Sequence, residues 1–475
     1  MNPTTLALAA AALLLSGCAS FSPDGGFGAV QQLTQERTGQ TPARLTRPAD
    51  QASAQARITE LLKAPLTADS AVELALLNNR GLQASFAELG IAEADRVQAG
   101  RLRGPSLSFG RLAGGGIIEI DRAVIFNLLG LLSLPAASRM EQGRFEQAQL
   151  QAASEAVGLA AAARRAFFRA VAAQELVKYG AQVKEAADAS NELARRMLQA
   201  GNFSKLQQMR EQAFYADATS QLARAQHLAL AEREGLTRLL GLSGDPQAFR
   251  LPDRLPDLPS APVDAKDAEQ TALDKRLDVL IARRSAKGLA QALSAAQATR
   301  WITGLDAGYQ NKSQTGERGQ NGYQIDLELP LFDLGAGASP RAARAEASYL
   351  QAQHRAAEVA DNARSEVRES YSAYRTAYDL ARHYRDEVVP LRKRISDENL
   401  LRYNGMLASV FELLADAKDQ VGSVTGYVEA LRDHWIAATD LQVALTGRSP
   451  DDAGKGSNAL SRTRAAPSTS AGPSH

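Results

Sequence analysis

The chain has 475 residues, and its 54 Lys and Arg residues nearly balance its 53 Asp and Glu residues, which leaves a formal net charge of +1. This balance lacks the basic excess of a nucleic-acid-binding surface, so we expect no nucleic acid partner. The length allows two or three ordinary domains. Beyond the N-terminal segment no apolar run reaches about 18 residues, and we therefore expect no transmembrane helix there.

The N-terminus predicts export. Residues 6–15 are apolar but too few to span a membrane, which is typical of a secretory signal. They lead into Leu-Ser-Gly-Cys ending at Cys18, which has the form of a bacterial lipobox, although the usual basic residues before it are missing. We expect cleavage after residues 1–17 and a lipid on the thiol of Cys18. The alternative is an ordinary signal peptide with an incidental cysteine.

Cys18 is the only cysteine, which excludes an intrachain disulfide in spite of an oxidising destination. Ala19 follows it, and without Asp at that position we expect sorting to the outer membrane of a Gram-negative cell.

The rest of the chain reads as two copies of one long unit, 67–241 and 271–447. Each copy has an Ala-rich helical segment, a stretch of alternating residues, and a very long helical run with a turn signal near its far end. The turn signals are Ala-Gly-Asn-Phe-Ser at 200–204 and Asn-Gly-Met-Leu-Ala-Ser at 404–409. A duplication of this size predicts a repeat architecture.

Candidate strands lie between the helical segments. Residues 106–110 and 118–121 alternate around a turn of three glycines, and an apolar run over 123–134 follows. In the second copy 304–310 and 323–329 alternate around a polar turn. Two interpretations remain open: surface hairpins, or strands that cross a bilayer with apolar residues outward and polar residues inward. Four strands cannot close a membrane barrel, so in the second case the chain must oligomerise.

Proline positions in the first copy predict unusually long helices. No proline lies between Pro135 and Pro246, so we expect one helix over 139–199 and a return helix over 203–240. The abundant Ala lets helices approach closely. Periodicity leaves open whether they form an antiparallel coiled coil of one chain or a cylinder of several chains.

The second copy repeats this plan with one difference. The expected helices cover 341–402 and 408–445, and Pro390 predicts a kink near Val388 and Val389. Several prolines between the copies predict a linker, and the Ser-, Pro- and Gly-rich C-terminus predicts disorder.

Three segments resemble, in order, the TolC-type outer-membrane efflux family. They are the opening segment 66–79, the stretch 89–95 with its continuation 104–107, and the strand exit Leu-Pro-Leu-Phe-Asp-Leu-Gly at 329–335. The resemblance covers residues 66–447. It implies a mostly α fold with β structure: a long α-helical barrel plus a transmembrane β-barrel assembled from three chains, with four strands per chain.

The resemblance also implies a function. Such a homotrimer is the exit duct of a tripartite efflux system, which passes small molecules or metal ions from an inner-membrane pump, expected to be of RND type, through a periplasmic adaptor to the outside. We expect a lipid anchor in the outer membrane, a large periplasmic portion and no cofactor. The expected divisions are a signal peptide (1–17), a lipidated N-terminal linker (18–65), a first repeat (66–245), a Pro-rich equatorial linker (246–270), a second repeat (271–447) and a disordered tail (448–475).

In that arrangement the two helix turns become periplasmic tips that meet the adaptor. Gly201 and Gly405 suit the left-handed backbone of a helix end. The alternative is a pair of simple helix caps without a partner. The expected contact residues are Gly201, Asn202, Ser204, Gly405, Met406 and Ser409.

Some members of the family narrow the aperture with acidic residues six and nine positions after the second turn's Gly. Here those positions hold Phe411 and Leu414, so the acidic pair does not carry over, and Glu412 and Asp416 are among the nearest acids. These four residues are the aperture candidates, and an apolar constriction is equally possible.

Nothing in the sequence predicts catalysis. Patterns typical of nucleophilic hydrolases, zinc proteases and P-loop enzymes are missing, and the five histidines lack ligand spacing, so we expect neither a catalytic nor a metal site. The alternatives to an efflux duct are a lipid-anchored periplasmic coiled-coil protein without a pore, a type I protein secretion duct, and a periplasmic enzyme on a helical scaffold.

Overall fold

The computed structural model describes residues 20–242, 249–299, 301–329 and 340–449. The predicted signal peptide and Cys18 lie outside the described residues, as does most of the strand exit at 329–335. The chain divides into two compact units, each built from three stretches of sequence. The sheet unit contains Met1–Val30, Ala84–Ala152 and Val279–Ala360, and the helical unit contains Gln31–Gln83, Ala153–Asp278 and Asp361–His475.

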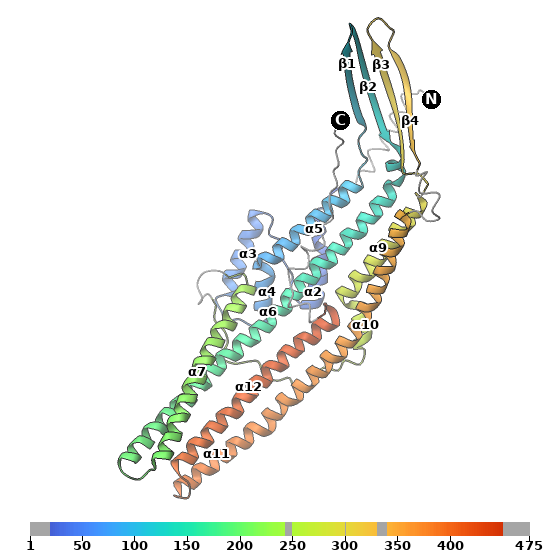
Figure 1. The fold of residues 1–475 in the computed structure, drawn as a ribbon. Coiled ribbons are helices and arrows are strands. Elements are labelled where there is room, and N and C mark those ends of the chain that lie inside the picture. Colours follow the sequence, from blue (N-terminus) through green and yellow to red (C-terminus); the bar gives the residue numbers. More distant parts are fainter. Residues whose placement is uncertain (1–19, 243–248, 300, 330–339, 450–475) are drawn as a thin grey trace. The chain divides into compact units, whose positions relative to one another are not determined.

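The sheet unit carries one four-stranded antiparallel sheet with the strand order β1-β2-β3-β4 (Figure 1). The strands are β1 (Ser106–Gly114), β2 (Ile117–Asn127), β3 (Gly304–Gln314) and β4 (Gln320–Glu328). Both predicted hairpins are confirmed. Gly115 and Gly116 have φ of 59° and 83°, which gives the first hairpin the two left-handed positions of a tight two-residue turn. The pairing of β2 with β3, which joins the two copies, has no signal in the local sequence pattern.

The order of elements is the same in both halves of the chain. α4 (Ala68–Asn78), α5 (Arg80–Ala99), a hairpin, α6 (Leu128–Gln199) and α7 (Lys205–Leu239) follow one another in the first. The second half begins with a short and a longer helix, continues with a hairpin, and ends with an interrupted long helix and a return helix. Its helices are α8 (Ala268–Lys275), α9 (Leu277–Ala298), α10 (Pro340–His383), α11 (Val389–Asn404) and α12 (Val410–Thr446).

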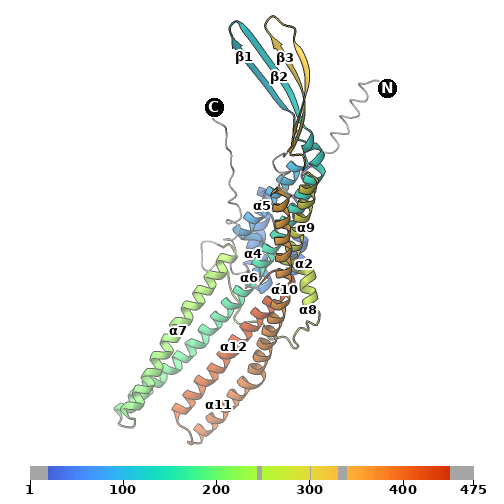
Figure 2. The ribbon, with the colours of Figure 1, turned by 45° about the vertical axis from the view of Figure 1, so that its right-hand side comes forward.

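Within the helical unit α7 runs back beside α6, and α12 runs back beside α11 (Figures 1 and 2). The predicted N-terminal linker contains two helices, α2 (Phe27–Thr38) and α3 (Pro48–Leu61). Arg448 and Ser449 are the first two residues of the predicted tail, and Ser449 forms hydrogen bonds with the helical unit. Ser449 donates its backbone N–H to Asp278 (3.2 Å) and its hydroxyl to Glu366 (2.8 Å).

α6 begins earlier than predicted. Asn127 caps it by accepting the Gly130 N–H on its side chain, and Pro135 lies inside the helix rather than before it. Proline removes only one helical hydrogen bond, here the bond to the Leu131 carbonyl, so the cap and the following good helix formers prevail.

The interruption predicted from Pro390 is confirmed. A π-helical turn, η1 (Tyr384–Val388), separates α10 from α11, and Pro390 occupies the first turn of α11. A wider turn accommodates a residue that lacks an N–H and crowds the carbonyl four residues before it.

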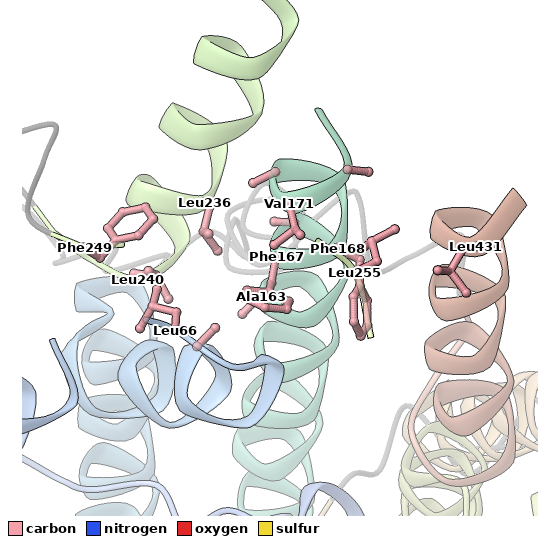
Figure 3. Close-up of a cluster of buried hydrophobic side chains, with 14 of the residues drawn as sticks. Leu66, Ala163, Phe167, Phe168, Val171, Leu236, Leu240, Phe249, Leu255 and Leu431 are labelled. Carbon is pink, nitrogen blue, oxygen red and sulfur yellow. The ribbon is translucent and has the colours of Figure 1, made fainter. Parts of the chain in front are cut away.

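A large hydrophobic core lies in the helical unit (Figure 3). Phe167 of α6 packs there with Leu66, with Leu240 at the end of α7, and with Phe249 and Leu255 from the segment between the two copies. All five side chains are at most 3% exposed. Truncating a buried Phe to Ala typically costs about 3–5 kcal/mol, so this core holds the inter-copy segment against the helices.

Among the described residues, no helix combines the length and the apolar character needed to cross a membrane.

Candidate functional site

The register of the sheet sorts its side chains into two chemically different faces. Residues directly opposite in an antiparallel pair share a face, and neighbours along a strand alternate. One face, here called the apolar face, is strongly exposed: Leu107 is 77%, Phe109 70% and Tyr323 83% accessible. Monomeric soluble proteins rarely expose so much contiguous apolar surface, so this face needs an apolar environment. Its apolar members include Leu107, Phe109, Ile118, Ile120, Val124, Phe126, Leu305, Tyr309, Tyr323, Ile325 and Leu327.

The opposite face, here called the polar face, carries every carboxylate of the four strands. Asp306 lies directly opposite Asp326, and Asp121 opposite Lys312. The Lys312 ammonium pairs with Glu119. Like charges in register, such as Asp306 and Asp326, are destabilising unless water or cations screen them, so this face suits an aqueous environment.

Both outer strands of the sheet are open. Within the described residues β1 pairs only with β2, and β4 pairs only with β3. Their free N–H and C=O groups are templates for pairing with another chain, and in lipid they must be paired.

The first predicted tip residue, Gly201, adopts the expected conformation at the turn between α6 and α7. Its φ is +75°. The Asn202 N–H donates to the Met197 carbonyl (2.9 Å) and the Gly201 N–H to the Leu198 carbonyl (3.1 Å), which is the bond pattern of a Schellman motif. Ser204 then caps α7 by accepting the Gln207 N–H (3.2 Å).

The second turn corrects the prediction for Gly405. Its φ is −81°, and the left-handed residue is Met406, at φ 59°. The Schellman bonds run from the Leu407 N–H to the Arg402 carbonyl (2.8 Å) and from the Met406 N–H to the Tyr403 carbonyl (2.9 Å). Ser409 caps α12 three residues later, as Ser204 does for α7. Met406 is therefore the counterpart of Gly201, and sequence reasoning missed it because a glycine stands next to it.

The first turn contacts the start of α12 in the helical unit. The rings of Phe203 and Phe411 stack with centroids 4.7 Å apart. Further along the same helices the Lys418 ammonium lies 4.4 Å from the centre of the Phe214 ring, in cation–π geometry. These contacts join the first turn and α7 to α12, and they involve the aperture candidate Phe411 rather than the six predicted tip residues.

The four aperture candidates differ in their surroundings. Phe411 is occupied by its stack on Phe203, and Leu414 is half-buried. Asp416 accepts a hydrogen bond from the Asn399 side chain and is also half-buried. Glu412 is exposed, and its carboxylate accepts the Ser409 hydroxyl (3.3 Å). Counted from Met406 instead of Gly405, the sixth position is Glu412.

Sequence reasoning also missed three hydrogen bonds that tie the segment 249–263, here called the linker strap, to aromatic side chains of α10 and α12. The Trp435 indole donates to the Pro256 carbonyl (3.1 Å), the Tyr378 hydroxyl donates to the Pro259 carbonyl (3.1 Å), and the Tyr374 hydroxyl accepts the Val263 N–H (2.9 Å). The strap thereby joins α10 and α12. Aromatic residues facing a Pro-rich linker were the available signal, but they lie more than 100 positions from it.

Two titratable groups lie under the strap. Burial raises the pKa of Glu175, against the opposing effect of the Leu255 N–H that its carboxylate accepts (3.3 Å). His434 is 1% exposed among Tyr374, Tyr378 and Trp435, and burial lowers its pKa to about 4. His434 is therefore neutral at ordinary pH. Across the described part of the chain, no group of three or more His, Cys, Asp or Glu residues is placed to hold a metal ion.

Comparisons with known proteins agree with this geometry. No model of a known protein family matches the chain. It is 26% identical over 303 residues to the cobalt-zinc-cadmium resistance protein CzcC of Cupriavidus metallidurans, which covers 60% of this chain and 69% of that protein.

Two solved structures share the fold at low identity. The outer-membrane channel OprN superposes with a TM-score of 0.67 at 18% identity, covering 87% of this chain and 95% of that one. The outer membrane protein VceC of Vibrio cholerae superposes with a TM-score of 0.65 at 16% identity, covering 80% of this chain and 96% of that one. These proteins are a metal resistance protein, an outer-membrane channel and an outer membrane protein. The chain therefore has the fold of the outer-membrane efflux channels that its sequence resembles.

Proposed function

We propose that the protein is the outer-membrane exit duct of a tripartite efflux system. The observation that carries this proposal is the sheet, which combines an exposed apolar face, a charged polar face and two open edges. A membrane barrel needs apolar side chains toward lipid, polar side chains toward its lumen, and no free edge. A soluble coiled-coil protein needs none of the three.

The open edges support a homotrimer. β1 of one copy would pair with β4 of the next, so that three chains supply twelve strands, and the helices of the three copies would form an α-barrel in the periplasm. Exposed apolar residues on α7 and α11, such as Leu230 (56%) and Leu391 (50%), support further burial against a second copy. Lipid on Cys18 would anchor the assembly to the outer membrane.

Metal cations are the proposed substrate class. The supporting observation is the similarity to a protein named for cobalt, zinc and cadmium resistance. A polar face rich in carboxylates suits a cationic solute, since rings of acidic side chains favour cations in channels. An inner-membrane pump of RND type and a periplasmic adaptor would deliver the ions.

The two tips are the proposed contact with the adaptor. Met406 is 93% exposed and Leu407 73%, and a non-glycine residue in the left-handed region is strained, which is common at functional sites. Gly201, Asn202, Ser204, Gly405 and Ser409 complete the contact. Glu412 is the preferred aperture residue among the four candidates.

Native mass in mild detergent tests the proposal first. We expect protein extracted from outer membranes to have about three times the mass of the processed chain, and to conduct ions in planar bilayers. A stable monomer or dimer without conductance would refute the duct and favour the coiled-coil protein without a pore.

Transport can be tested in cells that lack the gene. Loss of the protein should lower the tolerated concentration of cobalt, zinc or cadmium, and the intact gene should restore it. Unchanged metal tolerance with a conducting trimer would leave the duct in place and remove metal cations as its substrates.

A further inference from the structure

The two faces of the sheet differ in charge as well as in polarity: all five carboxylates lie on the polar face, and two of the three cations lie on the apolar face. The three cations are Arg111, Arg122 and Lys312, and only Lys312 lies on the polar face, among five carboxylates. Arg111 and Arg122 are the charged residues of the apolar face within β1–β4, and both are exposed. The strands therefore offer these guanidinium groups no carboxylate on their own face.

The register places the two arginines close together. Arg111 lies opposite Ile120, and Arg122 lies opposite Phe109, so the arginines are diagonal neighbours on adjacent strands. Diagonal positions are roughly 7–8 Å apart, within mutual reach of two long side chains. Arg122 also donates to the Asn311 side chain (3.3 Å), which orients it across the sheet. Two unpaired like charges at this spacing repel one another unless an anion lies between them.

The two arginines lie toward the hairpin-turn end of the strands. β1 runs from the helices toward its hairpin turn, and the arginines lie on the turn side of the row formed by Leu107, Val124, Tyr309 and Tyr323. On the apolar face, the strand positions on the helix side of that row contain no charged side chain. The apolar face thus passes from a wholly apolar zone into a zone that holds two guanidinium groups.

We propose that Arg111 and Arg122 together bind the phosphate of an anionic lipid head group at the outer surface of the membrane. Guanidinium groups match phosphate oxygens with paired hydrogen bonds, and an arginine at the edge of an apolar zone extends its charged end to the head-group level. The proposal rests on the membrane insertion of the sheet proposed above. A lipid is favoured over free phosphate because the adjoining rows of the same face are apolar and contact acyl chains in that arrangement.

The full-length protein can be tested in detergent with diphosphorylated lipid A as the probe. Native mass spectrometry would count the lipid A molecules that remain bound after washing. We expect retention to fall about tenfold or more in the double variant Arg111→Gln and Arg122→Gln, because two charge-assisted contacts are lost. Lys312→Gln, at a similar height on the polar face, is the matched control and should retain lipid A like the parent protein.

Three further measurements separate the possible outcomes. Retention by the parent protein should decrease with salt, and phosphatidylcholine should be retained less than lipid A. Equal retention by parent and double variant, or no preference over phosphatidylcholine, would overturn the proposal. Displacement of lipid A by inorganic phosphate at equal concentration would overturn the lipid assignment. If the double variant fails to assemble, Arg111→Lys with Arg122→Lys keeps both charges but loses the paired geometry, and should retain lipid A at an intermediate level. A parent protein that does not enter bilayers would instead refute the proposed function.

Discussion

The two copies of the repeat use different side chains to hydrogen-bond the carbonyls at the end of their return helices, α7 and α12. In each copy the junction between the short and the longer helix satisfies the last carbonyls of that copy's return helix, which have no partner within the helix. In the first, the Asn78 amide donates to the carbonyls of Leu240 (3.1 Å) and Gly241 (2.9 Å), and Asn79 donates to Leu239 (3.1 Å).

In the second copy charged groups replace the amides. Arg276, whose side chain is 1% exposed, reaches the Ala444 carbonyl (3.5 Å) and is held by Asp278 (2.6 Å) and Glu366 (2.7 Å). Burial alone would lower the pKa of Arg276, but the two carboxylates raise it above its ordinary value. The comparison teaches that the duplicated fold fixes where the helix end must be satisfied, and leaves open which side chain does so.

The largest expected effect comes from breaking the charged junction. Arg276→Ala removes the positive charge that Asp278 and Glu366 share in this partly buried network, so we expect a loss of about 3–5 kcal/mol in the free energy of unfolding. Thermal or denaturant unfolding of the detergent-solubilised protein measures it. Lys275→Ala, one residue earlier, is the control, and an equal loss in both variants would contradict the role of the network.

The return helices α7 and α12 also differ in a buried titratable residue, and we expect this difference to have a smaller effect on stability. His434 of α12 lies 13 residues before Gly447, and the residue at the same distance before Gly241 in α7 is Leu228, which is 45% exposed. The unfolded chain protonates His434 near pH 6.5, whereas the folded chain does so only near pH 4. Stability should therefore fall by about 3 kcal/mol as the pH drops from above 6.5 to below 4, and level off once the pH is below both pKa values.

The unfolding midpoint followed over this pH range tests the prediction. His434→Phe should remove that part of the pH dependence, while His227→Gln, at an exposed position of α7, should leave it unchanged. Identical pH profiles for the parent protein and His434→Phe would show that the buried imidazole does not contribute.

Breaking the uncharged junction should cost less. Asn78→Ala removes two hydrogen bonds to carbonyls but leaves no buried charge, so we expect a loss of about 1–2 kcal/mol. The same unfolding measurement, made beside Arg276→Ala, gives the ratio of the two effects. A loss as large as that of Arg276→Ala would contradict the distinction between the two junctions.

The smallest effects concern the two helix turns. Met406→Gly should stabilise the protein by up to about 1 kcal/mol, because glycine adopts a positive φ without steric cost, and Gly201→Ala should destabilise it by a similar amount. Gly405→Ala, at a negative φ, is the control and should change little. The unfolding midpoints of the three variants, compared with that of the parent protein, test this prediction. A destabilised Met406→Gly would indicate that contacts of the Met side chain outweigh its backbone strain.

Local patterns in the sequence predicted the local structure well. Alternation located all four strands, and proline positions located the long helices and the interruption before Pro390. The pairing of β2 with β3, the stack of Phe203 on Phe411 and the hydrogen bond from Trp435 to Pro256 were out of reach, because each joins residues far apart in the chain. The left-handed Met406 was missed because the preference of glycine for that conformation favoured Gly405.

The candidate sites divide in the same way. Alternation indicated that the sheet would have two different faces, but the placement of Arg111 beside Arg122 required the register between strands. The motif at the second turn located the turn but assigned its left-handed position to Gly405 instead of Met406. Counting from Met406 moves the sixth position from Phe411 to Glu412, and the aperture residues stay a prediction.

The π-turn at Tyr384–Val388 determines how a deletion in the interrupted long helix of the second copy, α10–η1–α11, would affect the turn at its end. The Val389 N–H bonds to the Tyr384 carbonyl five residues back, so the turn holds one residue more than an α-helical turn. The surplus residue is confined to one turn, and the faces of α10 and α11 keep their own registers on either side of it. A single-residue deletion within 384–388 would convert the turn to α-helix and rotate everything beyond it by about 100°. The turn between α11 and α12 would then point in a new direction while both helices kept their internal hydrogen bonds, so tip orientation in this protein is set by a count of residues some 20 positions away.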